Sequence, residues 1–84
     1  MTIKILGTGC PNCKRLEANT KKAVENLEVD AVVEKVEDIP SIMKYGVMST
    51  PALVIDDIVQ FMGRVASSDE IAGLIKSQIP GLTP

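Results

Sequence analysis

The sequence predicts a single α/β domain built around a mixed four-stranded sheet. Apolar residues make up 45% of the 84 residues, which is enough for one core, and strand-like and helical stretches alternate. A strand, a helix and a second strand come first, which favours parallel pairing, whereas the last two strands form a tight antiparallel hairpin. We therefore expect the order strand-helix-strand-helix-strand-strand-helix, with sheet order 2-1-3-4 and three flanking helices.

The first three elements occupy the N-terminal half of the chain. Residues 2–6, Thr-Ile-Lys-Ile-Leu, predict a strand that stops at Gly7. Apolar side chains recur at helical spacing between Lys14 and Glu28, so this segment is predicted to be a helix with one buried face. Residues 30–36, Asp-Ala-Val-Val-Glu-Lys-Val, predict the second strand. Extended back toward the N-terminus, the buried helix face contains Cys13, Leu16, Thr20, Val24 and Leu27.

A short helix and a hairpin come next. Asp38 is placed to cap that helix, Pro40 fits its first turn, and Gly46 can close it. Residues 52–55 and 58–62 are two apolar runs separated by a pair of aspartates. This layout predicts two antiparallel strands joined by a tight turn.

The last predicted element is a helix that begins with a capping box. Ser67 and Glu70 have the spacing of that motif, and Pro80 is expected to end the helix. Residues 80–84 are expected to form a frayed tail, and the whole chain, residues 1–84, is expected to form one domain. The apolar residues of the helix follow at helical period: Ile71, Leu74, Ile75 and Ile79.

Charge and composition exclude several classes of partner. The formal net charge is −2, no basic run is present, and the only aromatic residues are Tyr45 and Phe61, so nucleic-acid binding is not expected. No stretch approaches the roughly 18 apolar residues of a membrane span, and residues 1–7 are too short for a signal peptide. We expect a cytoplasmic monomer, in a compartment where structural disulfides are normally reduced.

The two cysteines of the chain, Cys10 and Cys13, are placed differently at the start of the first helix. Proline is favoured at the first helical position, so Pro11 places Cys10 at the N-cap, facing the free N–H groups of Asn12 and Cys13. These groups favour a thiolate, the form that attacks disulfides, and Gly9 leaves room for a partner chain. Our hypothesis is that Cys10 is the exposed nucleophile and Cys13 the buried resolving cysteine.

A second feature is the dipeptide Thr50-Pro51 directly before a predicted strand, where proline is tolerated. Together with the strand-CxxC-helix context, it makes the chain resemble the thioredoxin and glutaredoxin superfamily. In particular, the chain is similar to the small archaeal and bacterial thioredoxin-like proteins called redox-active disulfide protein 2. The resemblance covers nearly all of the chain and rests on residues 7–13, 45–55 and 63–65.

The resemblance implies a thioredoxin-like βαβαββα fold and a redox-active Cys10–Cys13 disulfide, with no other cofactor and no metal. It also implies a cis Thr50–Pro51 bond beside that disulfide, with the Thr50 backbone pairing with an extended substrate. By the same analogy Gly63 lines the groove, and Gly9, Pro11 and Asn12 of the motif are further candidate substrate-binding residues. The implied partners are disulfide-containing proteins and a reductase or dithiol that donates electrons.

The chain also departs from the family pattern. It has no tryptophan, and Lys4 stands on the strand before the motif, where thioredoxins carry a buried acid. The proton acceptor for Cys13 is therefore open, with water or Lys4 as candidates. A single glycine, Gly63, replaces the Gly-Gly segment that glutaredoxins use before the last helix, so glutathione binding is not expected.

Three functions remain open at this point. The leading one is a thiol-disulfide oxidoreductase, in which Cys10 attacks a protein disulfide and Cys13 resolves the mixed disulfide. The second is a soft-metal binding or delivery module that uses the two thiolates, although the chain has no histidine and too few ligands for a zinc site. The third is a redox-sensitive interaction module with a surface lined by Met43, Met48 and Met62, although methionine more often fills gaps in a core.

Overall fold

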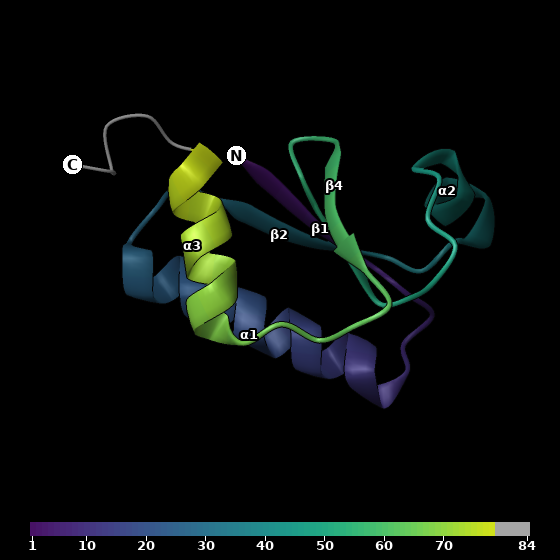
Figure 1. The fold of residues 1–84 in the computed structure, drawn as a ribbon, viewed down its shortest axis with the longest axis horizontal. Helices are drawn as coiled ribbons and strands as arrows, with labels where there is room; N and C mark the ends of the chain where they lie inside the picture. The colour runs from purple at the N-terminus through teal and green to yellow at the C-terminus, as the bar shows by residue number, and fades with distance from the viewer. Residues whose placement is uncertain (79–84) are drawn as a thin grey trace.

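The computed structural model describes residues 1–78 and contains the seven predicted elements in the predicted order (Figure 1). Ile79 and the expected tail, residues 80–84, lie outside the described residues. No helix within residues 1–78 has the length and apolar character to cross a membrane. The elements are β1 (Thr2–Leu6), α1 (Pro11–Leu27), β2 (Val32–Val36), α2 (Ile39–Lys44), β3 (Ala52–Ile55), β4 (Ile58–Met62) and α3 (Ser68–Gln78).

The four strands form one sheet in the order β2-β1-β3-β4, which confirms the predicted sheet order. β1 pairs with β2 in parallel and with β3 antiparallel, and β3 pairs antiparallel with β4. A register shift lies between Leu53, opposite Phe61, and Val54, opposite Val59, so one residue of β4 is extra at this point.

β2 is shorter than predicted, because it begins at Val32 instead of residue 30. Its partner strand begins at Thr2, which is in register with Val32, and the Val32 N–H donates to the Met1 carbonyl at 2.9 Å. Residues 30 and 31 therefore have no strand beside them to extend the parallel ladder. The prediction was wrong here because propensity marks a strand-like stretch but cannot show where its partner ends.

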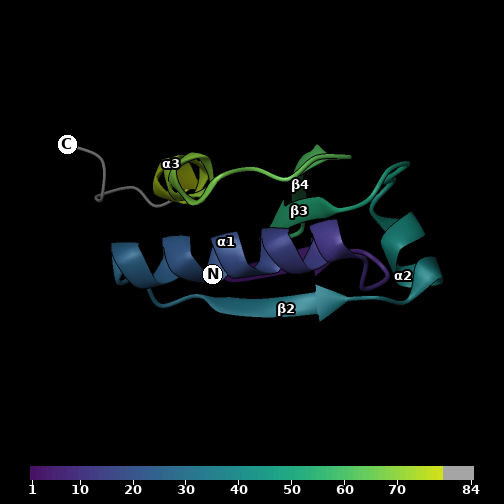
Figure 2. The ribbon, with the colours of Figure 1, turned by 90° about the horizontal axis from the view of Figure 1, so that it is seen from below.

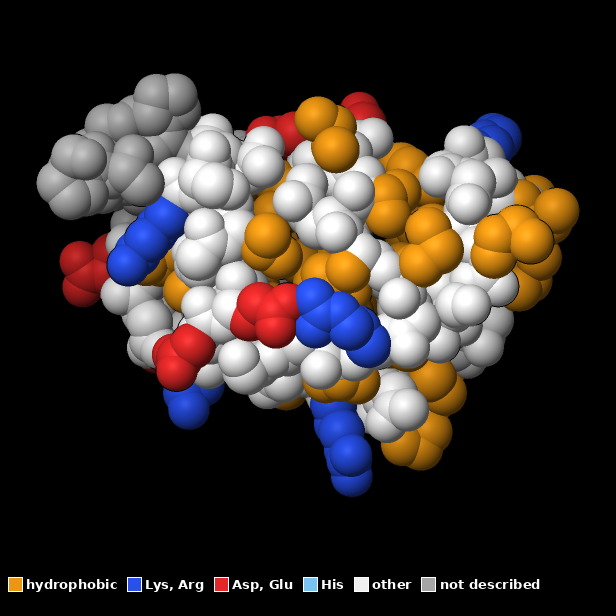
Figure 3. All heavy atoms as spheres, in the orientation of Figure 1, with side chains coloured by type: hydrophobic (Ala, Val, Ile, Leu, Met, Phe, Trp, Pro, Cys, Tyr) orange, Lys and Arg blue, Asp and Glu red, His pale blue; other side chains and the backbone are white. Residues whose placement is uncertain are grey.

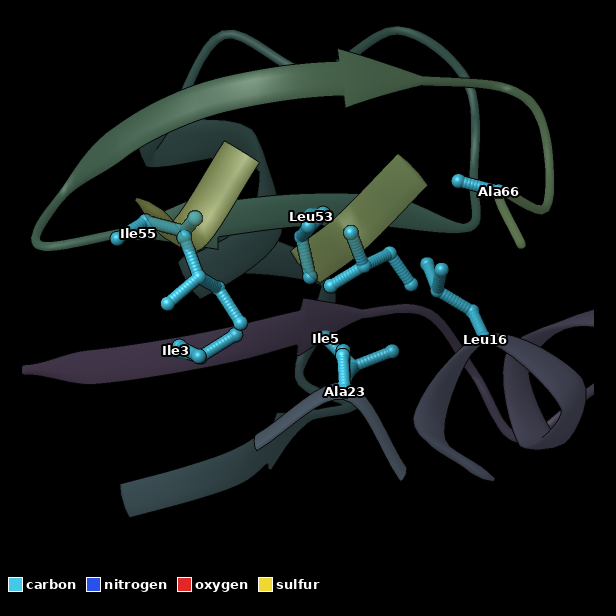
Figure 4. Packing of buried hydrophobic residues seen from close by; sticks show 9 residues of the cluster. Ile3, Ile5, Leu16, Ala23, Leu53, Ile55 and Ala66 are labelled. Atoms are coloured by element: carbon cyan, nitrogen blue, oxygen red, sulfur yellow. The ribbon is translucent and has the colours of Figure 1, made fainter. Parts of the chain in front are cut away.

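α1 and α3 cross and pack against each other over one face of the sheet, and α2 lies at one end of the molecule (Figures 1 and 2). The core under α2 lies on the other face. The larger core lies under α1 and α3, and its buried side chains from both helices and the sheet interdigitate (Figure 4). That core contains Ile3, Ile5, Leu16, Ala23, Leu53, Ile55, Ala66, Ile71 and Ile75. The smaller core under α2 contains Leu6, Ile42, Val47, Ala52 and Val54.

The two faces of the sheet follow from the alternation of side chains along β1. Ile3 and Ile5 enter the larger core, whereas Lys4 points to the other face, where its Nζ donates to the Tyr45 hydroxyl at 2.9 Å. On α1, the predicted polar member of the buried face, Thr20, is fully buried and donates its hydroxyl to the Leu16 carbonyl at 2.7 Å. Its hydroxyl is therefore satisfied within the helix.

Candidate active site

The CxxC motif lies where the chain leaves β1 and enters α1. The Gly7 N–H donates to the Val36 carbonyl at 3.0 Å, which continues the β1–β2 pairing by one residue. Cys10 is the N-cap of α1, with extended backbone angles of −68° and 163°, and Pro11 is the first helical residue. Gly9 has a φ of +85°, and a Cβ atom added there would have no heavy atom within 4 Å, so its backbone angle, and not crowding, favours glycine.

The two cysteine sulfurs lie 2.6 Å apart, and either thiol can donate a hydrogen bond to the other. The Cys13 N–H also donates to the Cys10 Sγ at 3.4 Å, as expected for a side chain at an N-cap. Cys10 is partly exposed, whereas Cys13 is buried, with 6% of its surface exposed. The two sulfurs are thus in contact but differ in their access to solvent.

Their surroundings shift the two pKa values in opposite directions. The hydrogen bond from the Cys13 thiol, followed by the backbone N–H of Cys13, lowers the pKa of Cys10. Burial, followed by the hydrogen bond with Cys10, raises the pKa of Cys13. Cys10 is therefore the first of the two to become a thiolate as the pH rises, and a thiolate is the nucleophilic form of cysteine.

Gly7 lies directly against the buried sulfur. A Cβ atom at this position would collide with the Cys13 Sγ and would lie 3.2 Å from the Cys13 Cβ and 3.9 Å from the Pro51 Cα. Gly7 therefore brings the end of β1, Cys13 and Pro51 into contact. From the sequence alone, Gly7 was predicted only to end a strand.

The Pro51 loop forms one flank of the site, on the β3 side of β1. The Thr50–Pro51 peptide bond is cis, Pro51 is buried, and Thr50 is exposed. The Gly63 N–H donates to the Pro51 carbonyl at 2.9 Å, and Gly63 has a φ of +75°. A Cβ at Gly63 would lie only 3.0 Å from the Cβ of Ser49, so glycine permits the close approach of the two loops.

The remaining candidate residues of the motif lie at the surface. Pro11 and Asn12 are exposed in the first turn of α1, beside the partly exposed Cys10. The structure therefore places Gly9, Pro11 and Asn12 around Cys10, and Pro51 near Cys13. Thr50 directly precedes Pro51 in the chain, and the Gly63 N–H is hydrogen-bonded to the Pro51 carbonyl.

A small pocket of about 40 Å³ forms the other flank, on the β2 side of β1. Residues from α1, from β1 and its end, and from β2 and its end line this pocket, among them Ile5, Gly7, Cys13, Glu17, Lys35 and Glu37. Glu17 lies one helical turn after Cys13, and its side chain is 17% exposed. Its carboxylate is 3.4 Å from the Lys21 Nζ and 4.0 Å from the Lys35 Nζ.

Two charged residues near the motifs in sequence lie elsewhere in the fold. The hypothesis that Lys4 assists Cys13 is wrong, because its Nζ contacts Tyr45 and lies 3.7 Å from Asp57 on the opposite face of the sheet from Ile5. Arg64 forms an ion pair with Glu70 and lies over the Phe61 ring, 4.5 Å from its centroid. These contacts hold Arg64 between β4 and α3.

Apolar side chains are exposed over β4 and toward the end of the molecule where α2 lies (Figure 3). The exposed fractions are 69% for Met43, 91% for Met48 and 41% for Met62, so these methionines do not fill gaps in the core. Met48 stands two residues before Thr50, in the loop that leads to the cis peptide bond.

Comparison with known proteins agrees with this geometry. A family model described as a thioredoxin domain matches residues 1–76. A thioredoxin from Methanothermobacter thermautotrophicus is 43% identical over 75 residues, which are 89% of this chain and 97% of that protein. A thioredoxin from Methanocaldococcus jannaschii is 42% identical over 81 residues, which are 96% of this chain and 93% of that protein. The matches confirm the resemblance to small thioredoxin-like proteins, and the chain belongs to the thioredoxin domain family of thiol-disulfide oxidoreductases.

Proposed function

We propose that this protein exchanges a Cys10–Cys13 dithiol or disulfide with disulfides of other proteins. The observation that carries the proposal is the pair of sulfurs 2.6 Å apart, one partly exposed with a lowered pKa and the other buried with a raised pKa. One thiol is thus suited to attack an incoming disulfide, and the other is held within reach to complete the exchange.

The reaction has two steps. The Cys10 thiolate attacks one sulfur of the substrate disulfide, forms a mixed disulfide, and releases the other substrate sulfur as a thiolate. The Cys13 sulfur then attacks the Cys10 sulfur, the bond from Cys10 to the substrate breaks, and the Cys10–Cys13 disulfide remains. Two electrons pass to the substrate, and a second dithiol or a reductase returns the protein to its reduced form.

The substrate segment is proposed to lie beside the Pro51 loop. Thr50 is exposed next to the buried Pro51, and the open side of Gly9 leaves the approach to Cys10 free. Backbone groups of an extended segment can pair with the backbone at Thr50, as in other cases where a strand is added to a protein surface. We propose that the protein acts as a monomer in the cytoplasm.

Trapping of the mixed disulfide tests this function. Reduced Cys13→Ser protein is mixed with insulin, as a model protein disulfide, and the products are separated without reductant and identified by mass. Cys13→Ser is expected to accumulate a disulfide between Cys10 and an insulin chain, whereas Cys10→Ser, the matched control, is not. The wild-type protein is expected to reduce insulin catalytically when dithiothreitol regenerates it. Absence of both the trapped species and the turnover would contradict the proposal.

A further inference from the structure

The second step of the exchange requires a proton acceptor for Cys13, and the CxxC motif itself does not contain one. Cys13 must lose its proton before its sulfur can attack Cys10, yet it is buried with 6% of its surface exposed. Burial raises the pKa of Cys13, whereas the backbone N–H groups of Asn12 and Cys13 at the start of α1 lower the pKa of Cys10. A proton acceptor near Cys13 would remove this obstacle.

The pocket on the β2 side of β1 connects Cys13 with one carboxylate of its own helix. Cys13 and Glu17 are four residues apart, so their side chains lie on the same face of α1, and both line the pocket. The volume of about 40 Å³ is enough for a few water molecules. Polar groups that line it on the other side come from Lys35 and Glu37.

The Glu17 carboxylate at this pocket lies near two ammonium groups. Its oxygen lies 3.4 Å from the Lys21 Nζ, one turn further along α1, and 4.0 Å from the Lys35 Nζ on β2. Lys35 is the register partner of Ile5, which also lines the pocket, so its side chain lies on the α1 face of the sheet. Glu37 lies 4.0 Å from the same ammonium group, and Lys14 lines the pocket from α1.

We propose that Glu17 accepts the Cys13 proton through water in this pocket during the resolving step. This inference rests on the proposed function. The Cys13 S–H bond breaks, the proton passes through water to the Glu17 carboxylate, and the Cys13 sulfur bonds to the Cys10 sulfur. The electron pair of the broken mixed disulfide leaves with the substrate sulfur, and solvent then removes the proton from Glu17. When a donor thiol opens the Cys10–Cys13 disulfide, the same path returns a proton to Cys13.

An aromatic disulfide separates the two steps in one experiment. Reduced protein is mixed with dithiobis(nitrobenzoate), which releases one coloured thiolate when Cys10 attacks and a second when Cys13 resolves the mixed disulfide. The first release depends on reagent concentration and the second does not, so stopped-flow absorbance measures both rates. Glu17→Gln is expected to keep the first rate and to slow the second by about tenfold or more at neutral pH, since general base catalysis contributes roughly 100-fold to 10,000-fold.

The pH profile distinguishes proton transfer from a structural effect. Without an acceptor, the resolving rate follows the hydroxide concentration and rises about tenfold per pH unit until Cys13 itself titrates. We therefore expect a steep profile for Glu17→Gln, a shallower one for the wild type, and convergence of the two at alkaline pH. Glu17→Asp is expected to restore part of the rate, and Glu25→Gln, an exposed position on the same helix, is the matched control.

The outcomes separate this inference from the function on which it rests. A wild-type protein that never releases the first thiolate would contradict the exchange function itself. If the wild type completes both releases and Glu17→Gln has an unchanged second rate and pH profile, Glu17 is not the acceptor. A slowing caused by Glu37→Gln but not by Glu17→Gln would also overturn the assignment, because both side chains line the pocket.

Discussion

At the scale of single residues, the two thiols differ because their hydrogen bonds and their burial act in opposite directions. Cys10 accepts from both the thiol and the N–H of Cys13, so its charged form is stabilised, whereas Cys13 is desolvated against Gly7. The largest single cause for Cys10 is the neighbouring thiol and not the helix terminus. This ranking can be tested because one side chain can be removed while the helix stays in place.

Removal of the Cys13 thiol is expected to raise the pKa of Cys10 toward that of an ordinary cysteine. In Cys13→Ala the backbone N–H groups remain but the thiol donor is lost, so less Cys10 thiolate forms at a given pH. The rate of alkylation by iodoacetamide against pH measures the shift. Asn12→Ala is the matched control, because Asn12 contributes through its backbone N–H. An unchanged profile in Cys13→Ala would assign the lowered pKa to the helix terminus.

Gly7→Ala is expected to destabilise the reduced protein by about 1–3 kcal/mol, the usual cost of an extra methyl group in a packed interior. The added Cβ would collide with the Cys13 Sγ, so either the sulfur or the end of β1 must move. Gly73→Ala is the matched control, since no atom lies within 4 Å of its Cβ position in α3, and it is expected to stabilise by about 0.5–1 kcal/mol. Urea unfolding measures the change in the free energy of unfolding for Gly7→Ala and for Gly73→Ala. Equal effects of the two substitutions would disprove the crowding at Gly7.

The residues around the motif were only partly predictable from sequence. The positions of Cys10 and Pro11 at the helix start followed from local rules, since an N-cap and a first-turn proline depend on neighbours in the chain. Gly7 and Glu17 acquire their roles from contacts across the fold. A signal for Glu17 was present, because it lies four residues after Cys13, but only the fold shows that β2 closes a pocket there.

At the scale of elements, the capping box predicted for α3 is half formed. The Glu70 N–H donates to the Ser67 Oγ at 3.2 Å, which caps the helix as expected. The Glu70 carboxylate pairs with Arg64 instead of returning to the Ser67 backbone. The spacing of Ser67 and Glu70 correctly predicted the hydrogen bond that caps the helix. It could not predict that Arg64, in the preceding loop, pairs with the Glu70 carboxylate.

Ser67→Ala is expected to cost about 1 kcal/mol of stability, since it removes a side chain that satisfies a free N–H at the start of α3. Ser68→Ala, one residue further along, is the matched control, because Ser68 is the first residue inside α3 and not its cap. Thermal unfolding followed by circular dichroism compares the two. If both variants lose the same stability, the Ser67 cap contributes nothing specific.

At the scale of the whole molecule, the sheet lies between two cores and contributes buried side chains to each of them. All four residues of β3 are buried, with Leu53 and Ile55 in the larger core and Ala52 and Val54 in the smaller one. The sheet order was predictable because a strand-helix-strand unit and a hairpin leave few topologies. Which helix covers which face depends on the alternation along β1, where Lys4 faces Tyr45 while Ile3 and Ile5 face α1 and α3.

Leu53→Ala is expected to destabilise the protein by about 2.7–5 kcal/mol, because it opens a cavity at a fully buried position of the shared strand. The free energy of unfolding of a typical domain is only about 5–15 kcal/mol, so the loss of one buried side chain removes a large share of it. Urea unfolding, followed both by circular dichroism and by Cys13 alkylation, measures the loss. The two signals are expected to change together, and separate transitions would show that the cores unfold independently. Ile58→Ala, at a position 60% exposed, is the control.

The central strand divides the neighbourhood of Cys13 into two sides, with the Pro51 loop on the β3 side and the pocket on the β2 side. A protein held along the Pro51 loop and against Cys10 would reach the pocket where Gly9 lines it, whereas Glu17, Lys35 and Glu37 line it from α1 and from β2 and its end. The proposed water path from Cys13 to Glu17 therefore lies on the β2 side of β1, and the proposed substrate segment lies on the β3 side.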